Sequence, residues 1–110
     1  MDFEILSEGE NKLTLNISLD IMTPKDLQDT ECVVAININF YSKDKISVLA
    51  TTIRGYVDVD ISLNEEERER EIKKYAAPIF YDILRNFISE TIEKTNVDFP
   101  NIPPMKEIDL

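Results

Sequence analysis

Residues 75–92 read YAAPIFYDILRNFISETI, a stretch in which apolar side chains return every three or four residues. This spacing gathers them on one side of an α-helix, in an unusually wide and aromatic stripe. The stripe consists of Ile72, Tyr75, Ala76, Ile79, Phe80, Ile83, Leu84, Phe87, Ile88 and Ile92. Pro78 lies inside the pattern, and because proline fits best in the first turn of a helix, we expect a kink or a new start near Ala77. The main helix is therefore predicted over about residues 78–95.

Upstream of this helix, residues 62–74 read SLNEEEREREIKK. Ser62 or Asn64 is a candidate N-cap, and three glutamates follow in the first turn, where the helix dipole favours negative charge. A first helical segment is expected here. Beyond Asn96 the spacing of three prolines excludes a helix and predicts an extended, polyproline-like tail.

Before residue 62 the apolar period is two, which is typical of half-buried strands. Residues 13–21, LTLNISLDI, alternate without interruption, and residues 32–41 and 46–61 continue the pattern, with SKDK between the last two as a hairpin loop. The short run FEIL, residues 3–6, is a candidate edge strand, and Gly55 marks a bulge or a close approach. The apolar faces are assigned to Leu13, Leu15, Ile17, Leu19 and Ile21; to Cys32, Val34, Ile36, Ile38 and Phe40; and to Leu49, Ile53, Val57, Val59 and Ile61. The fold class is therefore α+β, an antiparallel sheet of three to four strands followed by a long helix, in a single domain over residues 1–110.

Composition limits the function classes. The chain has 110 residues, 43% of them hydrophobic, with no apolar run near the ~20 residues that a membrane span needs. Its net charge of −10 repels phosphate backbones and anionic lipids, so we expect no nucleic-acid or membrane partner. No charged segment followed by an apolar run opens the sequence, and the single Cys32 cannot form an internal disulfide. A cytoplasmic location is the expectation.

Catalytic chemistry is not indicated. The chain has no histidine, which excludes the common triads and imidazole zinc sites, and two glycines leave no phosphate-binding loop. Asp20, Asp58 and Asp60 could gather on one sheet face around a cation, but solvent-facing acids on a strand are ordinary. We expect no enzyme activity, no metal and no cofactor, and Cys32 is expected to be a small buried hydrophobe.

The order of elements resembles the SecB family of bacterial export chaperones. The segments that carry the resemblance are TECVVAININF from Thr30, IRGYVDVDI from Ile53, KYAAPIFYDILRNFISETI from Lys74 and VDFPNIPPM from Val97. Its most specific part is Tyr75, Pro78, Phe80, Arg85 and Ile88 taken with Phe99 and Pro100. The resemblance implies a tetrameric, ATP-independent chaperone that holds unfolded precursor proteins for translocation and delivers them to the SecA motor.

Client chains are expected in a groove between the sheet and the tail, at Phe40, Tyr56, Phe99, Ile102 and Met105. A dimer or tetramer is expected to form through the helical stripe, at Ile79, Phe80, Ile83, Leu84, Phe87 and Ile88. The sequence departs from the family in three places. It stops just past the proline stretch, where the family has a second helix, its first strand is shortened to MDFEILS, and it has Ala50 near the position of an acid used for SecA docking. The alternative is a dedicated partner-binding module, such as an antitoxin-associated chaperone, that needs no SecA.

Overall fold

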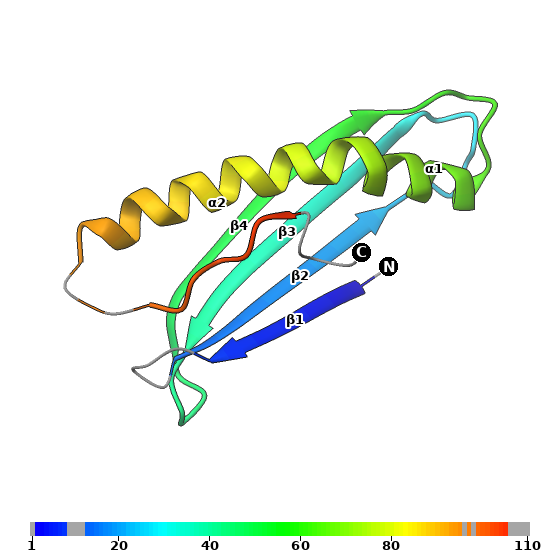
Figure 1. The fold of residues 1–110 in the computed structure, drawn as a ribbon. Helices are drawn as coiled ribbons and strands as arrows, with labels where there is room; N and C mark the ends of the chain where they lie inside the picture. The colour runs from blue at the N-terminus through cyan, green and yellow to red at the C-terminus, as the bar shows by residue number, and fades with distance from the viewer. Residues whose placement is uncertain (1, 9–12, 96, 98, 106–110) are drawn as a thin grey trace.

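A computed structural model of the chain describes residues 2–8, 13–95, 97 and 99–105. Its strands are β1 (Asp2–Glu8), β2 (Thr14–Met22), β3 (Glu31–Tyr41) and β4 (Ser47–Asp58), and they form one antiparallel sheet in sequence order (Figure 1). A helical layer lies on one face of this sheet. The α+β class is confirmed, and the candidate edge strand at residues 3–6 lies within β1.

The two central strands bury one face each, as their alternation predicts. In the register of β2 and β3, Leu15 pairs with Phe40 and Ile17 with Ile38. Odd-numbered side chains of β2 therefore share a face with even-numbered side chains of β3. All ten residues assigned to the apolar faces of these two strands are buried. Cys32 is one of them, a free and buried cysteine as expected.

Strand β4 ends earlier than its sequence pattern predicts. The strand stops at Asp58, and the carboxylate of Asp60 then accepts a hydrogen bond from the backbone N–H of Ser62, at 2.9 Å. This turn carries the chain out of the sheet, so Ile61 is 54% exposed and is not part of the apolar strand face. The assignment of Ile61 to that face was wrong because alternation continues for three residues beyond the last strand pairing.

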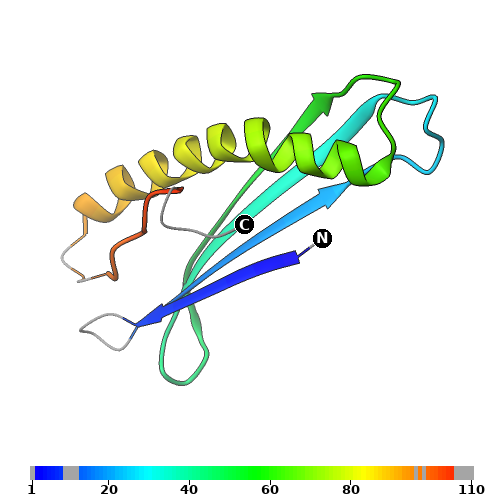
Figure 2. The same ribbon diagram turned by 45° about the vertical axis from the view of Figure 1, so that its right-hand side comes forward.

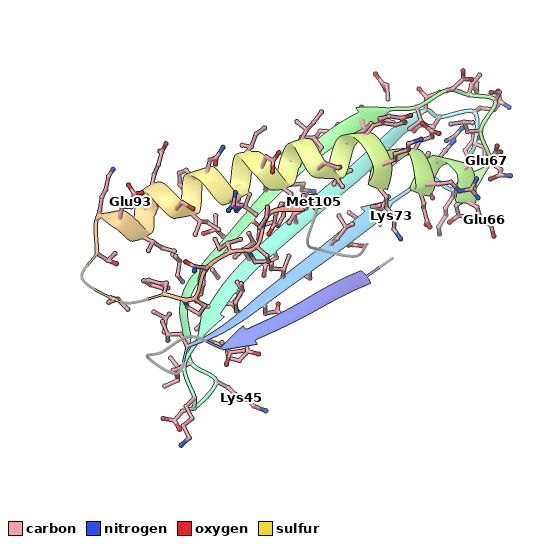
Figure 3. All side chains as sticks on the ribbon, viewed as in Figure 1. Lys45, Glu66, Glu67, Lys73, Glu93 and Met105 are labelled. Atoms are coloured by element: carbon pink, nitrogen blue, oxygen red, sulfur yellow. The ribbon has the colours of Figure 1, made fainter. Side chains whose placement is uncertain are left out.

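Helix α1 (Glu65–Glu71) begins at a capping box. Asn64 Oδ1 accepts from the N–H of Glu67 at 2.9 Å, and Glu67 Oε1 accepts from the N–H of Asn64 at 3.1 Å. Of the two candidate caps, Asn64 is therefore the N-cap. Figure 3 shows Glu66 and Glu67 at this end of the helical layer, where negative charge is favoured.

A single π-helical turn, η1 (Ile72–Ala76), joins α1 to helix α2 (Ala77–Glu93). The N–H of Ala77 bonds to the carbonyl of Ile72, five residues earlier. Pro78 has no N–H to give to the preceding turn, and a wider turn at this point is one way to relieve that loss. Glu71, Ala76 and Ala77 keep helical dihedrals, so residues 65–93 form one long helix that is interrupted by the π-turn and does not start again at Ala77. Pro78 lies in the first turn of α2, as predicted.

The apolar face of the sheet is covered by two segments. Helix α2 lies over β3 and β4 and buries Ala77, Tyr81, Leu84 and Ile88. Residues 99–105, called the tail below, run back beside α2 on the same face, over the middle strands (Figures 1 and 2). No helix in the described part of the chain is long and apolar enough to cross a membrane.

Candidate functional site

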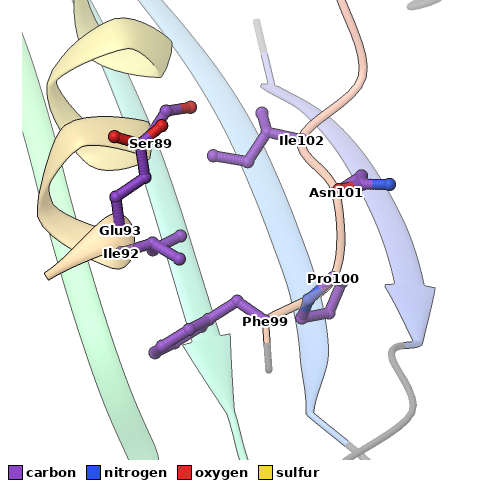
Figure 4. Close-up of a pocket in the computed structure, with 7 residues that line it drawn as sticks. All are labelled: Ser89, Ile92, Glu93, Phe99, Pro100, Asn101 and Ile102. Atoms are coloured by element: carbon purple, nitrogen blue, oxygen red, sulfur yellow. The ribbon is translucent and has the colours of Figure 1, made fainter. Parts of the chain in front are cut away.

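An open cleft of about 230 Å³ lies between the last turns of α2 and the tail. Ile92, Phe99 and Ile102 contribute apolar groups to its lining, and polar groups, from residues that include Ser89, Glu93 and Asn101, make up the larger share of its accessible surface (Figure 4). Pro100 completes the lining. Concave surfaces that combine apolar and polar groups are the usual form of ligand sites in proteins, so this cleft is the candidate site.

The floor beneath the tail is aromatic. The ring of Phe99 lies edge-on to the ring of Phe40 in β3, with centroids 5.0 Å apart and planes at 77°. This T-shaped arrangement is one that aromatic pairs prefer. Phe40 is fully buried, and Ile102, three residues beyond Phe99, is only 7% exposed. The tail is therefore anchored in the core at two points.

Helix α2 also holds the main chain of the tail. Arg85 Nε donates to the carbonyl of Ile102 at 3.0 Å, and the hydroxyl of Tyr81 donates a short hydrogen bond to the carbonyl of Pro103. Tyr81 and Arg85 are one helical turn apart, so they present their donors on the same side of α2. Tyr81 and Arg85 thus bind two consecutive main-chain carbonyls, and these hydrogen bonds do not depend on the side chains of the residues that carry the carbonyls.

The surroundings of Tyr81 keep its phenol protonated, so that it can donate a hydrogen bond. Burial raises the pKa of the Tyr81 phenol well above its usual value, and the positive charge of Arg85 only partly opposes this. The hydroxyl therefore keeps its proton at every physiological pH. It can act as a donor to a carbonyl under all conditions in which the protein functions.

The predicted client residues do not all lie together. Phe40, Phe99, Ile102 and Met105 pack in or against one core, and Figure 3 shows Met105 at the end of the tail. Tyr56 lies on the opposite face of the sheet, because β4 alternates and its even-numbered residues face outward; it is 67% exposed. Phe40 and Ile102 are buried by the chain itself, so they form the floor of the site rather than a free surface.

The predicted interface residues divide between two sides of α2. Leu84 and Ile88 are buried against the sheet of their own chain. Phe80 is half-buried over Gly55, where its ring occupies the space that a Cβ would take. Gly55 thus marks a close approach, the second of the two predicted alternatives. The register irregularity between β3 and β4 lies elsewhere, where Phe40 and Tyr41 of β3 pair with Leu49 and Ser47 of β4. The remaining three, Ile79, Ile83 and Phe87, are exposed.

Sequence reasoning missed Tyr81 and did not assign Arg85 to the site. Tyr81 stands outside the assigned stripe, but with Ala77, Leu84 and Ile88 it completes a series spaced four, three and four residues apart. That series is the narrower inward face of the helix and was available from the sequence. Arg85 carries no such signal, because its role depends on the path of the tail.

A buried arginine stabilises the other end of the helical layer. Arg68 is fully buried and donates to the carbonyls of Leu63, Leu27 and Asp29, at 3.0, 2.7 and 2.7 Å. It ties α1 to the loop between β2 and β3. Burial raises the pKa of the nearby Cys32 thiol, although Arg68 opposes the shift. This cluster is a structural tie rather than a ligand site, since Arg68 is fully buried beneath its own chain and its donors do not line the cleft described above.

Among the described residues no group of three or more His, Cys, Asp and Glu side chains could hold a metal ion. Comparisons with protein-family models, with curated proteins and with solved structures find no match to this chain. Fold and site together define a small α+β protein with an open cleft of mixed polar and apolar lining, next to two side chains, Tyr81 and Arg85, that bind main-chain carbonyls of the tail. Its function is inferred from those features.

Proposed function

We propose that the protein is a SecB-like holdase, an ATP-independent chaperone that binds unfolded or precursor proteins. The observation that supports this most directly is the open cleft between α2 and the tail, which combines apolar and polar groups and lies next to side-chain donors that bind main-chain carbonyls. Unfolded segments offer apolar side chains and unpaired backbone groups, the two features that such a cleft can accept without requiring one sequence.

The charge of the chain favours the same class of partner. A net charge of −10 attracts basic unfolded segments and keeps the chaperone itself soluble. The buried, unpaired Cys32 is compatible with a reducing compartment, so we place the protein in the cytoplasm. The role is that of a binding protein rather than an enzyme, with SecA as the delivery partner if clients are destined for export.

The protein is further proposed to act as a homo-oligomer, a dimer or a tetramer. Ile79, Ile83 and Phe87 follow one another at intervals of four residues along α2 and are 62%, 54% and 57% exposed. A row of large apolar side chains on one flank of a helix is costly to leave in water and is typical of an interface. Light scattering should give a mass above the 12.7 kDa of the monomer, and Ile83→Glu should lower it.

The holdase proposal is tested by aggregation suppression. A denatured protein is diluted into buffer with equimolar chaperone and no nucleotide, and light scattering should stay low. Ile92→Glu places a charge in the cleft and should abolish the effect. Ile61→Glu, the same change at an exposed residue in the turn after β4, is the matched control and should retain it.

Two outcomes contradict the proposal. If the wild-type protein fails against several unfolded substrates, it is not a holdase. If it instead holds one folded or nascent protein tightly and ignores generic unfolded chains, the dedicated partner-binding alternative is correct.

A further inference from the structure

We propose that the tail occupies its own chain's client groove as an internal competitor, and that the groove binds in trans an extended peptide of the same chemistry. The ligand class is an apolar residue followed by proline, with further apolar residues three and six positions after the first. This inference rests on the proposed holdase function, since it names the kind of client segment and how access to it is regulated.

The spacing of the buried tail residues defines the ligand. A polyproline-like chain has three residues per turn, so residues 99, 102 and 105 share one side. Phe99, Ile102 and Met105 pack against the core, Pro100 is also buried, and Asn101 is exposed. The groove therefore contacts every third side chain and the proline after the first of them, and it tolerates a polar residue at the next position.

The main-chain contacts explain how another peptide can take the place of the tail. Arg85 and Tyr81 bind the carbonyls of Ile102 and Pro103, groups that any peptide carries. The three prolines of the tail have no N–H, so these positions need no hydrogen-bond acceptor in the groove. Proline also limits the unbound conformations of a ligand, which lowers the entropy lost on binding.

The groove is not completely filled by the tail. The cleft of about 230 Å³ runs beside Phe99, Pro100 and Ile102, between them and the last turns of α2. An incoming peptide has room for a first contact there before the tail leaves. Because the tail is tethered, its effective concentration in the groove is high. The apparent affinity of the groove for a free peptide is therefore the intrinsic affinity multiplied by the fraction of time that the tail is unbound.

This competition predicts that a change in the tail and a change in the groove alter the affinity for a free peptide in opposite directions. Phe99→Ala weakens the tail but leaves the groove intact, so a free peptide should bind more tightly. In the Phe99→Ala background, where the tail is already weakened, Arg85→Met removes a donor from the groove, keeps an apolar stem of similar length, and should weaken peptide binding. A tail that only stabilises the fold would not give the first effect.

The test uses the full chain and a fluorescent peptide with the sequence of residues 97–106, VDFPNIPPMK. Anisotropy should show binding to Phe99→Ala that is roughly tenfold tighter than to the wild type. Adding Arg85→Met to that variant should weaken binding by roughly tenfold. A peptide with Asp in place of its Phe and Ile is the control and should not bind.

Circular dichroism checks that each variant is folded. If Phe99→Ala does not fold, Met105→Ala provides the tail-side change, and if neither folds the tail is an essential part of the core and the proposal is wrong. Equal affinity for wild type and variant, or no saturable binding, also overturns it. A dimer of the wild type that Phe99→Ala dissociates would assign the groove to the tail of a second copy instead, and would overturn it too.

Aggregation suppression, measured on the same samples, separates this inference from the proposed function. Suppression without peptide binding refutes the internal competitor alone. Loss of both in the wild type and in the tail-side variant refutes the holdase as well.

Discussion

The contact between Gly55 and Phe80 allows a quantitative test of how α2 packs on β4. A Cβ added to Gly55 would lie 2.5 Å from Phe80 Cζ and 2.8 Å from Cε1, far inside van der Waals contact. The backbone of Gly55 is not in the left-handed region, so alanine meets no backbone strain there. The clash with the ring should cost about 1–3 kcal/mol. Restricting the unfolded chain offsets about 0.4–1 kcal/mol of this.

The cause is isolated by a double-mutant cycle. Phe80→Leu removes the ring atoms that the new Cβ would meet, so Gly55→Ala in that background should be neutral or stabilising by up to about 1 kcal/mol. The coupling free energy between the two sites should therefore be about 1–3 kcal/mol. Urea unfolding followed by circular dichroism measures all four corners of the cycle.

Phe87→Leu is the matched control, because Phe87 lies on the same helix but is exposed. Its effect should add to that of Gly55→Ala within about 0.5 kcal/mol. If Gly55→Ala and Phe80→Leu are also additive, the ring does not limit the approach of α2 to β4. The placement of the helix over that strand would then be wrong.

Three further perturbations test other contacts. Arg68→Met should lower the free energy of unfolding by about 3 kcal/mol or more, because three carbonyls lose a charged donor. Arg70→Met, at an exposed site, should change it little. Similar losses for both variants would contradict the structural role of Arg68. Cys32 should react with a thiol reagent at least ~100-fold more slowly in the native protein than in urea, since only the exposed thiolate reacts. Rapid native labelling would show that the cover over β3 opens readily. Because the pKa of Tyr81 is raised in the folded protein, its contribution to the free energy of unfolding is complete below the unfolded pKa of about 10. As the pH rises above that value, the contribution is lost by about 1.4 kcal/mol per pH unit. Thermal unfolding of Tyr81→Phe should lack that loss, and parallel curves for both proteins would be inconsistent with a buried phenol.

The sheet, the start of the helix and the place of Pro78 within it could be predicted because each depends on short-range chemistry. Alternation in residues 13–21 and 32–41 assigns the buried faces of β2 and β3 directly. Asn64 and Pro78 act within a single helical turn, through a capping side chain and a missing donor, so their roles are also visible in sequence. The same local reasoning failed at Ile61, where a turn ended the strand while the alternation continued.

The site could be predicted only in part, because it depends on which segment covers the sheet. Period-two alternation shows that Phe40 points to the apolar face, but it does not show that Phe99 lies on top of it. The partner of Arg85 is a carbonyl of Ile102, 17 residues away, and no side-chain pattern identifies a backbone acceptor. Tyr56 was predicted to bind clients together with these residues. Strand alternation, however, places it on the face of the sheet opposite to that of its neighbour Gly55.

The two proposed roles of α2 are compatible because they use different flanks of the helix. Arg85, Ser89 and Ile92 contact the tail or line the cleft, on one side of the buried face. Phe80 contacts β4 on the other side, and helical spacing places Ile83 and Phe87, three and seven residues on, along that same flank. A second copy bound to the β4 flank therefore leaves the cleft open. Ile83→Glu should accordingly separate the subunits without changing peptide affinity in the Phe99→Ala background, and a joint loss of both would mean that assembly completes the groove.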